Sequence, residues 1–183
     1  MRCGAGDAWM YANRGRAHHS LGHLTEALAD FDEAVRRDPT FAGAYAARGS
    51  VYASQGHVDK AYADLDKAVE LAPNDASIRV ERGEQRLAQK DVDRALDDFD
   101  QAVSLNPVDA TSVYLRGYAW MSLGDAAHAL ADYDRAIQLD PKLAAAFSYK
   151  SEVLRNQGKL NQAIEAASAA IELAPDDARF HSI

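Results

Sequence analysis

Three histidines, His18, His19 and His23, lie close enough together in the sequence to suggest a metal site. His19 and His23 are four residues apart, a spacing that places two imidazoles on one face of a helix, where they can bind zinc. However, His23 directly follows Gly22, at which we expect the helix to have ended, and no carboxylate or thiol completes the ligand set. We therefore interpret His23 as a turn residue and predict no metal site.

A pair of glutamates, Glu81 and Glu84, is the best candidate for general acid–base chemistry. The two residues share one face of a predicted helix, but such catalysis needs a pocket that shifts the pKa of a carboxyl group. The sequence also contains no glycine-rich phosphate loop, nucleophile elbow or paired-cysteine motif. We predict that this chain is not an enzyme and needs no cofactor. That it is a segment of a larger enzyme or signalling protein is an alternative.

A third group of charged residues recurs along the chain, with one arginine followed by two aspartates that are two residues apart. The arginines are Arg14, Arg48, Arg82 and Arg116, and the aspartates are Asp30 and Asp32, Asp64 and Asp66, Asp98 and Asp100, and Asp132 and Asp134. At the last recurrence Lys150, Ala166 and Ser168 replace all three, and residues that change together are expected to touch. We predict ion pairs between two helices. A row of cation ligands is less favoured, because the aspartates of each pair point in different directions on a helix.

A repeated structural element must position these residues, because the sequence has a period of 34 residues. All five prolines keep this interval: Pro39, Pro73, Pro107, Pro141 and Pro175. Alanine fills two further positions in every repeat and glycine fills one position in four of them, as expected where two helices approach closely. Apolar residues recur at helical spacing, and no stretch alternates as a strand would. Each repeat is therefore predicted to form two antiparallel helices, such as 42–55 and 58–71.

The repeated pattern resembles that of the tetratricopeptide repeat (TPR) family. In the fourth repeat the matching residues are Arg116, Gly117, Trp120, Ala129, Tyr133, Ala136 and Pro141. The resemblance implies an all-α fold, a right-handed superhelical solenoid of five helix-turn-helix repeats. One departure is common to all the repeats, since an arginine or lysine stands where leucine is usual in the family.

The repeats account for nearly the whole chain. We predict an N-terminal tail at 1–7, repeats at 8–41, 42–75, 76–109, 110–143 and 144–177, and the truncated start of a further helix at 178–183. Solenoids usually finish with a polar capping helix, whereas the last helix of this chain would expose Ile164 and Ile171. This favours a fragment of a longer protein over an end that another molecule covers.

The charge and the apolar content exclude several classes of partner. The chain of 183 residues has a net charge of −8, and no repeat is basic, so it lacks the positive stripe with which nucleic-acid binders displace counterions. No apolar run is long enough to span a bilayer, and we predict no membrane partner. The single cysteine, Cys3, cannot form an internal disulfide, which fits a reducing, cytoplasmic location.

By resemblance to the TPR family, the first helix of each repeat lines a concave groove that holds a partner. The candidate partner-binding residues on this face are Trp9, Asn13, Arg16 and His19 in the first repeat, Glu81 and Glu84 in the third, Tyr114, Leu115, Tyr118 and Met121 in the fourth, and Tyr149, Glu152 and Arg155 in the fifth. Aromatic residues and methionine are favoured at binding patches because they bury much area at low entropic cost.

We therefore predict a protein-interaction scaffold that binds a partner peptide or helix in this groove. The apolar anchors would be Tyr114, Tyr118, Met121 and Tyr149, and charged groups such as Arg16 and Glu81 would orient the ligand. Self-assembly into a homo-oligomer, through the grooves or through uncapped ends, is the alternative.

Overall fold

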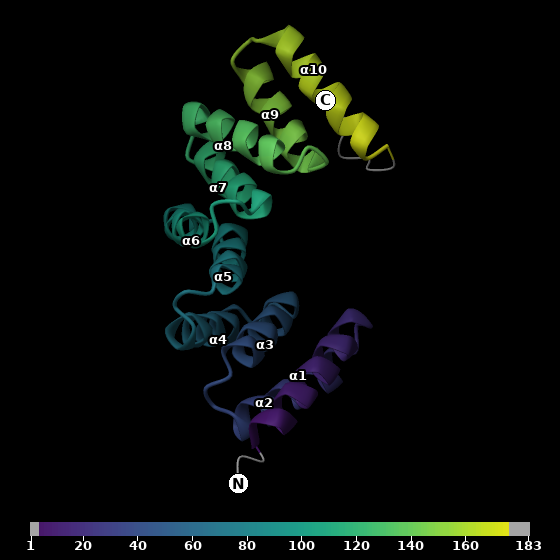
Figure 1. Cartoon of the computed structure of the whole chain (residues 1–183), viewed down its shortest axis with the longest axis vertical. Coiled ribbons are helices and arrows are strands. Elements are labelled where there is room, and N and C mark those ends of the chain that lie inside the picture. Colours follow the sequence, from purple (N-terminus) through teal and green to yellow (C-terminus); the bar gives the residue numbers. More distant parts are fainter. Residues whose placement is uncertain (1–3, 176–183) are drawn as a thin grey trace. The chain divides into compact units, whose positions relative to one another are not determined.

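A computed structural model describes residues 4–175 of the chain, and within this range it contains α-helices and no strand (Figure 1). The ten helices are α1 (Gly4–Ser20), α2 (Leu24–Arg37), α3 (Ala42–Ser54), α4 (Val58–Leu71), α5 (Ala76–Ala88), α6 (Val92–Leu105), α7 (Ala110–Ser122), α8 (Ala126–Leu139), α9 (Ala144–Asn156) and α10 (Leu160–Leu173). The prediction of an all-α fold with two helices in each repeat is confirmed.

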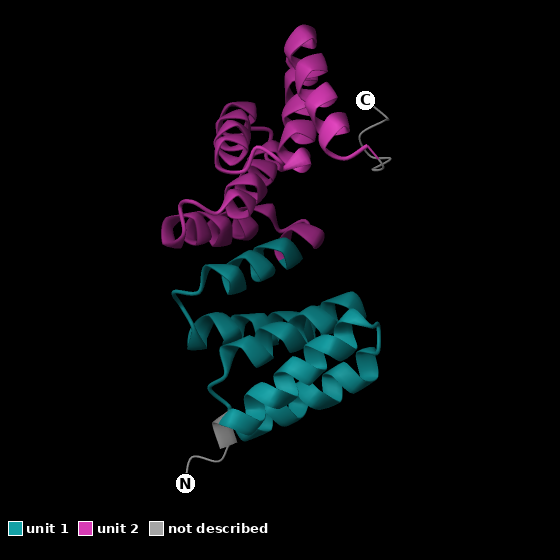
Figure 2. Cartoon of the chain, turned by 45° about the vertical axis from the view of Figure 1, so that its right-hand side comes forward, with its two compact units in different colours: residues 1–85 teal, residues 86–183 magenta. Residues whose placement is uncertain are grey.

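Two compact units make up the chain, Met1–Gln85 and Arg86–Ile183, and the boundary between them falls inside α5 (Figure 2). Within each unit, successive helices form hairpins: α1 with α2 and α3 with α4 in the first unit, and α7 with α8 and α9 with α10 in the second. The second helix of a hairpin also packs on the first helix of the next one, as α2 does on α3 and α8 does on α9. Each helix is therefore held by its neighbours in sequence, as in a repeat protein.

The turn inside each hairpin requires a backbone conformation with positive φ. Glycine adopts it in four hairpins, for example at Gly22 with φ 76° and at Gly124 with φ 82°. In the turn between α5 and α6 Lys90 takes this role with φ 63°, a conformation that costs a residue with a side chain about 1 kcal/mol or more. His23 directly follows the first of these turns and precedes α2, so it does not share a helix with His19.

The two helices of a hairpin pack tightly at a glycine of the first helix. A methyl group added at Gly117 would lie 3.0 Å from a ring carbon of Tyr133, and one added at Gly15 would lie 2.8 Å from the ring of Phe31. In the fifth repeat Ser151 occupies this position and is fully buried, and the facing ring is replaced by Ala167. The small side chain of Ala167 leaves room for Ser151, so the two departures from the repeat pattern compensate each other.

The repeated arginines bind the repeated aspartates, as predicted. Arg48 donates two hydrogen bonds of 2.7 Å to Asp64 of its own repeat and one of 2.7 Å to Asp32 of the preceding repeat. Arg116 binds Asp132 in the same bidentate manner, with distances of 2.8 and 2.6 Å, and it reaches back to the preceding repeat as well. Each of these arginines therefore joins a hairpin internally and also joins it to the hairpin before it.

The fifth repeat keeps only half of this arrangement. Lys150 binds Asp134 of the preceding repeat at 2.6 Å, but Ala166 stands where the aspartate of its own repeat would be. Because only one carboxylate remains to be bound, the single ammonium group of a lysine suffices. The other repeats use an arginine, whose guanidinium can bind two carboxylates.

One predicted boundary differs from the structure, and another falls outside the described residues. Helix α1 begins at Gly4, inside the stretch 1–7 that was expected to form a tail, and Asp7 on this extra turn binds Arg37 of α2 at 2.7 Å. The predicted start of a further helix at 178–183 lies outside the described residues. Among the described residues no helix combines the length and the apolar character needed to cross a membrane.

Candidate functional site

In the first unit, the predicted binding residues lie on α1 and α5. Trp9 and Arg16 are exposed, whereas Asn13 and His19 are partly buried. Arg16 donates hydrogen bonds of 3.4 Å to the Asn13 side chain and to the carbonyl oxygen of Gly43 at the start of α3. These contacts hold the guanidinium between the first helices of two successive repeats.

Glu81 of α5 is the acidic counterpart of Arg16 in this unit. Its carboxylate accepts a hydrogen bond of 3.5 Å from the Ser50 hydroxyl of α3. Burial raises the pKa of Glu81, and the Ser50 hydrogen bond and the charge of Arg16 partly oppose this shift. Glu84, one turn further along α5, lies more open to solvent. The first unit therefore presents a basic and an acidic group with small side chains between them.

In the second unit, four tyrosines from three helices form one cluster, with Tyr149 of α9 at its centre. The centroid of the Tyr149 ring lies 5.0 Å from that of Tyr118 in an edge-to-face arrangement, 5.9 Å from that of Tyr114 and 6.3 Å from that of Tyr133. These spacings are in the range at which aromatic pairs attract each other. Tyr133 of α8 is completely buried, while the other three rings are only partly buried. The exposed parts of these rings form a surface that rests on the buried Tyr133.

Met121 extends this cluster toward the end of α7. The Tyr133 hydroxyl donates to the Met121 sulfur at 3.7 Å, and burial raises the pKa of Tyr133, so the hydroxyl keeps its proton. Met121 also lines a small cavity of about 230 Å³ together with Val153 and Asn156 of α9. We refer to the surface formed by Tyr114, Tyr118, Met121 and Tyr149 as the tyrosine surface.

The structure thus brings together the four residues that were predicted as apolar anchors. Leu115 is different, because it is buried and contributes to the core rather than to the surface. Consecutive residues point about 100° apart around a helix, so that Leu115 and Tyr114 face different surroundings. Glu152 is partly buried and Arg155 is exposed, both on α9. Tyr133, which supports the other three rings from below, was not predicted as part of the site. Its place in the repeat pattern indicates only a packing residue.

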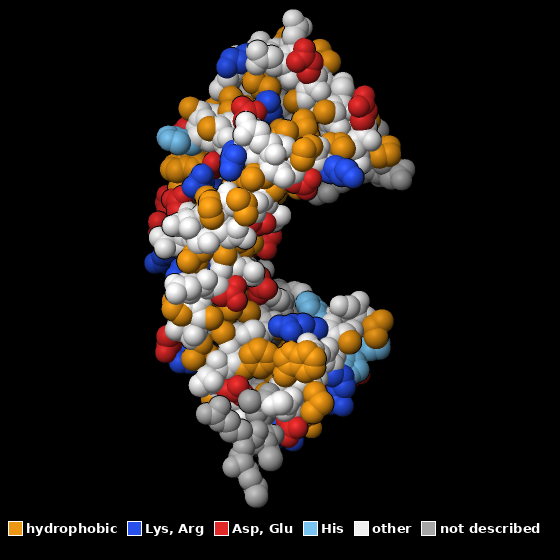
Figure 3. Space-filling model, in the orientation of Figure 1, with side chains coloured by type: hydrophobic (Ala, Val, Ile, Leu, Met, Phe, Trp, Pro, Cys, Tyr) orange, Lys and Arg blue, Asp and Glu red, His pale blue; other side chains and the backbone are white. Residues whose placement is uncertain are grey.

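The histidines of the first repeat do not form a metal site in the described part of the chain. His18 lies 4.0 Å from a carboxylate oxygen of Asp30, and its ring centroid is 5.7 Å from that of His23, but within residues 4–175 no three potential ligands converge to hold a metal ion. Figure 3 shows basic and acidic side chains mixed over the visible face of each unit.

Solved structures of TPR proteins share this fold. YrrB, described as a TPR protein with an unusual peptide-binding site, is 25% identical, with a TM-score of 0.75, and the match covers 96% of this chain and 90% of YrrB. The PilF protein of Pseudomonas aeruginosa is 18% identical, with a TM-score of 0.89 over 96% of this chain and 80% of PilF. MamA of Desulfovibrio magneticus RS-1 is 23% identical, with a TM-score of 0.80 over 94% and 97% of the two chains. A search of curated proteins found no match.

Sequence models of the TPR family match along most of the chain. Two models described as tetratricopeptide repeat match residues 42–75 and 80–144, and a third with the same description matches residues 150–177. A fourth, described as TPR repeat, matches residues 15–56. The matches reach all five of the repeats defined by the proline period, and the helix pairs and the solved structures agree with them. The chain therefore belongs to the tetratricopeptide repeat family.

Proposed function

We propose that this chain is a non-enzymatic scaffold that binds a peptide or a helix of a partner protein with the first helices of its repeats. The observation that carries the proposal is the tyrosine surface of α7 and α9, where three partly exposed rings and a methionine gather within one unit. Large apolar side chains that stay partly exposed on a rigid support are typical of binding surfaces.

The chemistry of the two units predicts the character of the ligand. The tyrosine surface favours an apolar or aromatic side chain, which would gain contact with the ring faces and edges. In the first unit, the carboxylates of Glu81 and Glu84 favour a basic group on the ligand, whereas Arg16 favours an acidic or carbonyl group. The peptide-binding site attributed to YrrB supports a peptide ligand, since that protein shares the fold over most of its length.

A selected peptide provides the test of this proposal. Binders would be selected from a random peptide library on the whole chain, and the dissociation constant of the best one would be measured by fluorescence anisotropy. Tyr118→Ala and Tyr149→Ala should each weaken binding by about tenfold or more, as expected for aromatic residues at the centre of an interface.

Leu160→Ala serves as the matched control, because it removes an exposed apolar side chain of the same unit from α10. This variant should bind like the unchanged chain, and all variants should melt at similar temperatures. Selected peptides that bind equally well to both tyrosine variants would contradict the assignment of the tyrosine surface.

Self-assembly is a second candidate function, supported by the apolar face of α10. Leu160 and Ile164 are both exposed, whereas Ala126 and Leu130, at the equivalent positions of α8, are partly buried. Two such faces could pair in a symmetric dimer. Sedimentation of the whole chain would show a mass that rises with concentration, and Ile164→Glu should abolish the rise. A monomer at all concentrations would exclude this function.

A further inference from the structure

A second surface lies on α1. In later repeats, the equivalent side of the first helix packs against the preceding hairpin. The surface on α1 consists of Met10, Arg14 and Ala17, and we call it the α1 outer face. Met10 is 57% exposed, although the residues at its position in the four following repeats are buried: Ala44, Ile78, Ser112 and Ala146. Ala17 is likewise exposed, whereas its equivalents Val51 and Ala119 are completely buried. The α1 outer face therefore has the form of a packing surface that no helix covers among residues 4–175.

Arg14 shows the same difference in its hydrogen bonds. It binds Asp30 of its own repeat with Nε and Nη2, at 2.7 and 2.5 Å, as the later arginines bind their own aspartates. In Arg48 and Arg116, Nη1 binds an aspartate of the preceding repeat. Among the described residues no carboxylate lies on Nη1 of Arg14, and its side chain is 63% exposed, against 17% for Arg48 and 25% for Arg116.

The helices that cover this face in later repeats share one short pattern. An aspartate is followed by alanine two residues later and by valine or isoleucine three residues later: Asp32 and Val35, Asp66 and Val69, Asp100 and Val103, and Asp134 and Ile137. The aspartate binds the arginine or lysine of the next repeat, and the aliphatic side chain packs in the core with the residue at the Met10 position. Val69 and Ile78 share one such cluster, and Ile137 and Ala146 share another.

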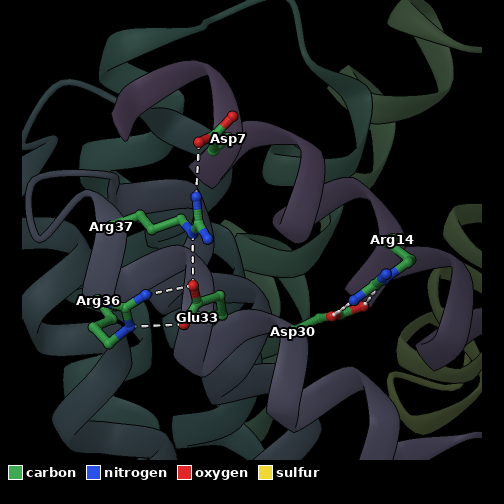
Figure 4. A network of polar contacts seen from close by, with 6 residues as sticks. All are labelled: Asp7, Arg14, Asp30, Glu33, Arg36 and Arg37. Carbon is green, nitrogen blue, oxygen red and sulfur yellow. Dashed lines mark hydrogen bonds and ion pairs between the residues drawn. The ribbon is translucent and has the colours of Figure 1, made fainter. Parts of the chain in front are cut away.

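The surroundings of Arg14 leave room for side chains of such a helix. Asp7, Met10, Tyr11, Arg14 and Arg37 line a cleft of about 320 Å³. The guanidinium groups of Arg14 and Arg37 lie over the Tyr11 ring, 5.3 and 4.7 Å from its centroid. Arg37 is bound by both Asp7 and Glu33. Arg14 is bound by Asp30, as Figure 4 shows. The cleft thus combines an apolar floor with a guanidinium that has donor capacity left.

We propose that the α1 outer face docks an amphipathic helix of a partner protein that carries an aspartate three residues before a valine or isoleucine. The aspartate binds Nη1 of Arg14, and the aliphatic side chain covers Met10. A second copy of this chain is a poorer occupant, because its last described helix, α10, has Ser168 in place of the aspartate, three residues before Ile171.

The probe is a labelled peptide with the sequence of residues 58–71, which contains Asp66 and Val69. A hydrocarbon staple between positions 60 and 64 keeps it helical. Asp64 binds Arg48 of its own repeat, so the staple lies on the side away from the proposed contact. The whole chain should bind this peptide, and the Asp66→Asn peptide should bind about tenfold more weakly because one partner of a charge pair is lost.

Variants of the chain locate the binding. Met10→Glu and Ala17→Arg should each abolish binding, because they place a charge or a large side chain in the contact. Both positions are exposed in the free chain, so the melting temperature should not change. Leu21→Ala, which removes an exposed apolar side chain directly after the end of α1, is the matched control and should leave the affinity unchanged.

Several outcomes would overturn this inference. Equal affinities of the unchanged peptide and the Asp66→Asn peptide would remove the role of the aspartate, and unchanged binding by Met10→Glu would move the contact elsewhere. A mass that rises with concentration and is restored to the monomer value by Met10→Glu would identify a second copy as the occupant. None of these results depends on the tyrosine surface, whose variants leave α1 intact.

Discussion

Arg48 binds two carboxylates that differ in their exposure to solvent. The side chain of Asp64 is 9% exposed, whereas that of Asp32 is 57% exposed, and Arg48 itself is 17% exposed. The hydrogen bonds to Asp64 are the main cause of the raised pKa of Arg48. The two ion pairs therefore share one arginine but lie in different surroundings.

We predict that Arg48→Ala lowers the free energy of unfolding by about 3 kcal/mol, because it leaves the buried Asp64 without its partner. Asp32→Ala should cost at most about 1 kcal/mol, since it breaks only the exposed pair. Urea unfolding followed by circular dichroism would measure both values. Similar small losses for the two variants would mean that the inner pair stabilises the fold no more than the outer one does.

Glu81 should make stability depend on pH. Because burial raises its pKa in the folded chain above the ordinary value of 4.5, the folded state holds the proton more tightly than the unfolded state. The contribution of this group to stability is then complete below pH 4.5 and is lost as the pH rises through the raised pKa. Glu81→Gln should remove this loss, so that the variant melts at a higher temperature than the unchanged chain at pH 7.

Thermal melts from pH 4 to pH 8 would compare the two chains. Glu26→Gln is the control, because Glu26 is exposed on α2 and no hydrogen bond or ion pair involves it among the described contacts. An identical pH profile for Glu81→Gln and the unchanged chain would contradict the prediction.

At the scale of the helices, the contact between α7 and α8 depends on the match between Gly117 and Tyr133. An added methyl group at Gly117 would meet both the Tyr133 ring and the Cβ atom of Asp132 at 3.0 Å. We predict that Gly117→Ser destabilises the chain by about 1–3 kcal/mol, as overpacking of a close contact does. Chemical unfolding would measure the change.

The fifth repeat suggests the control, because Ser151 is accommodated there opposite Ala167. In the double variant Gly117→Ser/Tyr133→Ala, the serine should cost less than it does alone, which would appear as a coupling energy between the two positions. Additive costs would show that the serine destabilises α7 for a reason other than the facing ring.

At the scale of the whole molecule, stability should be local. Because each helix packs on its neighbours in sequence, the free energy of a repeat protein is a sum over repeats and the interfaces between them. Gly117→Ser should therefore lower the hydrogen-exchange protection of α7 and α8, and to a lesser extent of α6 and α9, and it should leave α1–α4 protected. Exchange measured by mass spectrometry would resolve these helices. Equal loss of protection in both units would instead indicate a single cooperative unfolding step.

The sequence by itself determined the helices of this protein and how they pair. Prolines, alanines and the glycines equivalent to Gly117 recur with one period because each repeat needs a turn, a close helix contact and an apolar face. Residues that are near one another in the sequence meet these local requirements, so the sequence reveals them. The joint loss of Arg and both Asp residues in the fifth repeat also predicted the ion pairs, because contacts that recur leave a recurring pattern.

Only the tertiary structure decided which side chains remain accessible. Leu115 and Tyr114 are adjacent and both apolar in character, yet Leu115 is buried while Tyr114 stays partly exposed. Arg14 and Arg48 hold the same place in the repeat, but only Arg48 is covered by a preceding hairpin among the described residues. Exposure depends on which helices pack on a face, and residues distant in the sequence supply those helices. For this reason the sequence could indicate the tyrosines as binding residues, whereas the α1 outer face became visible only in the folded chain.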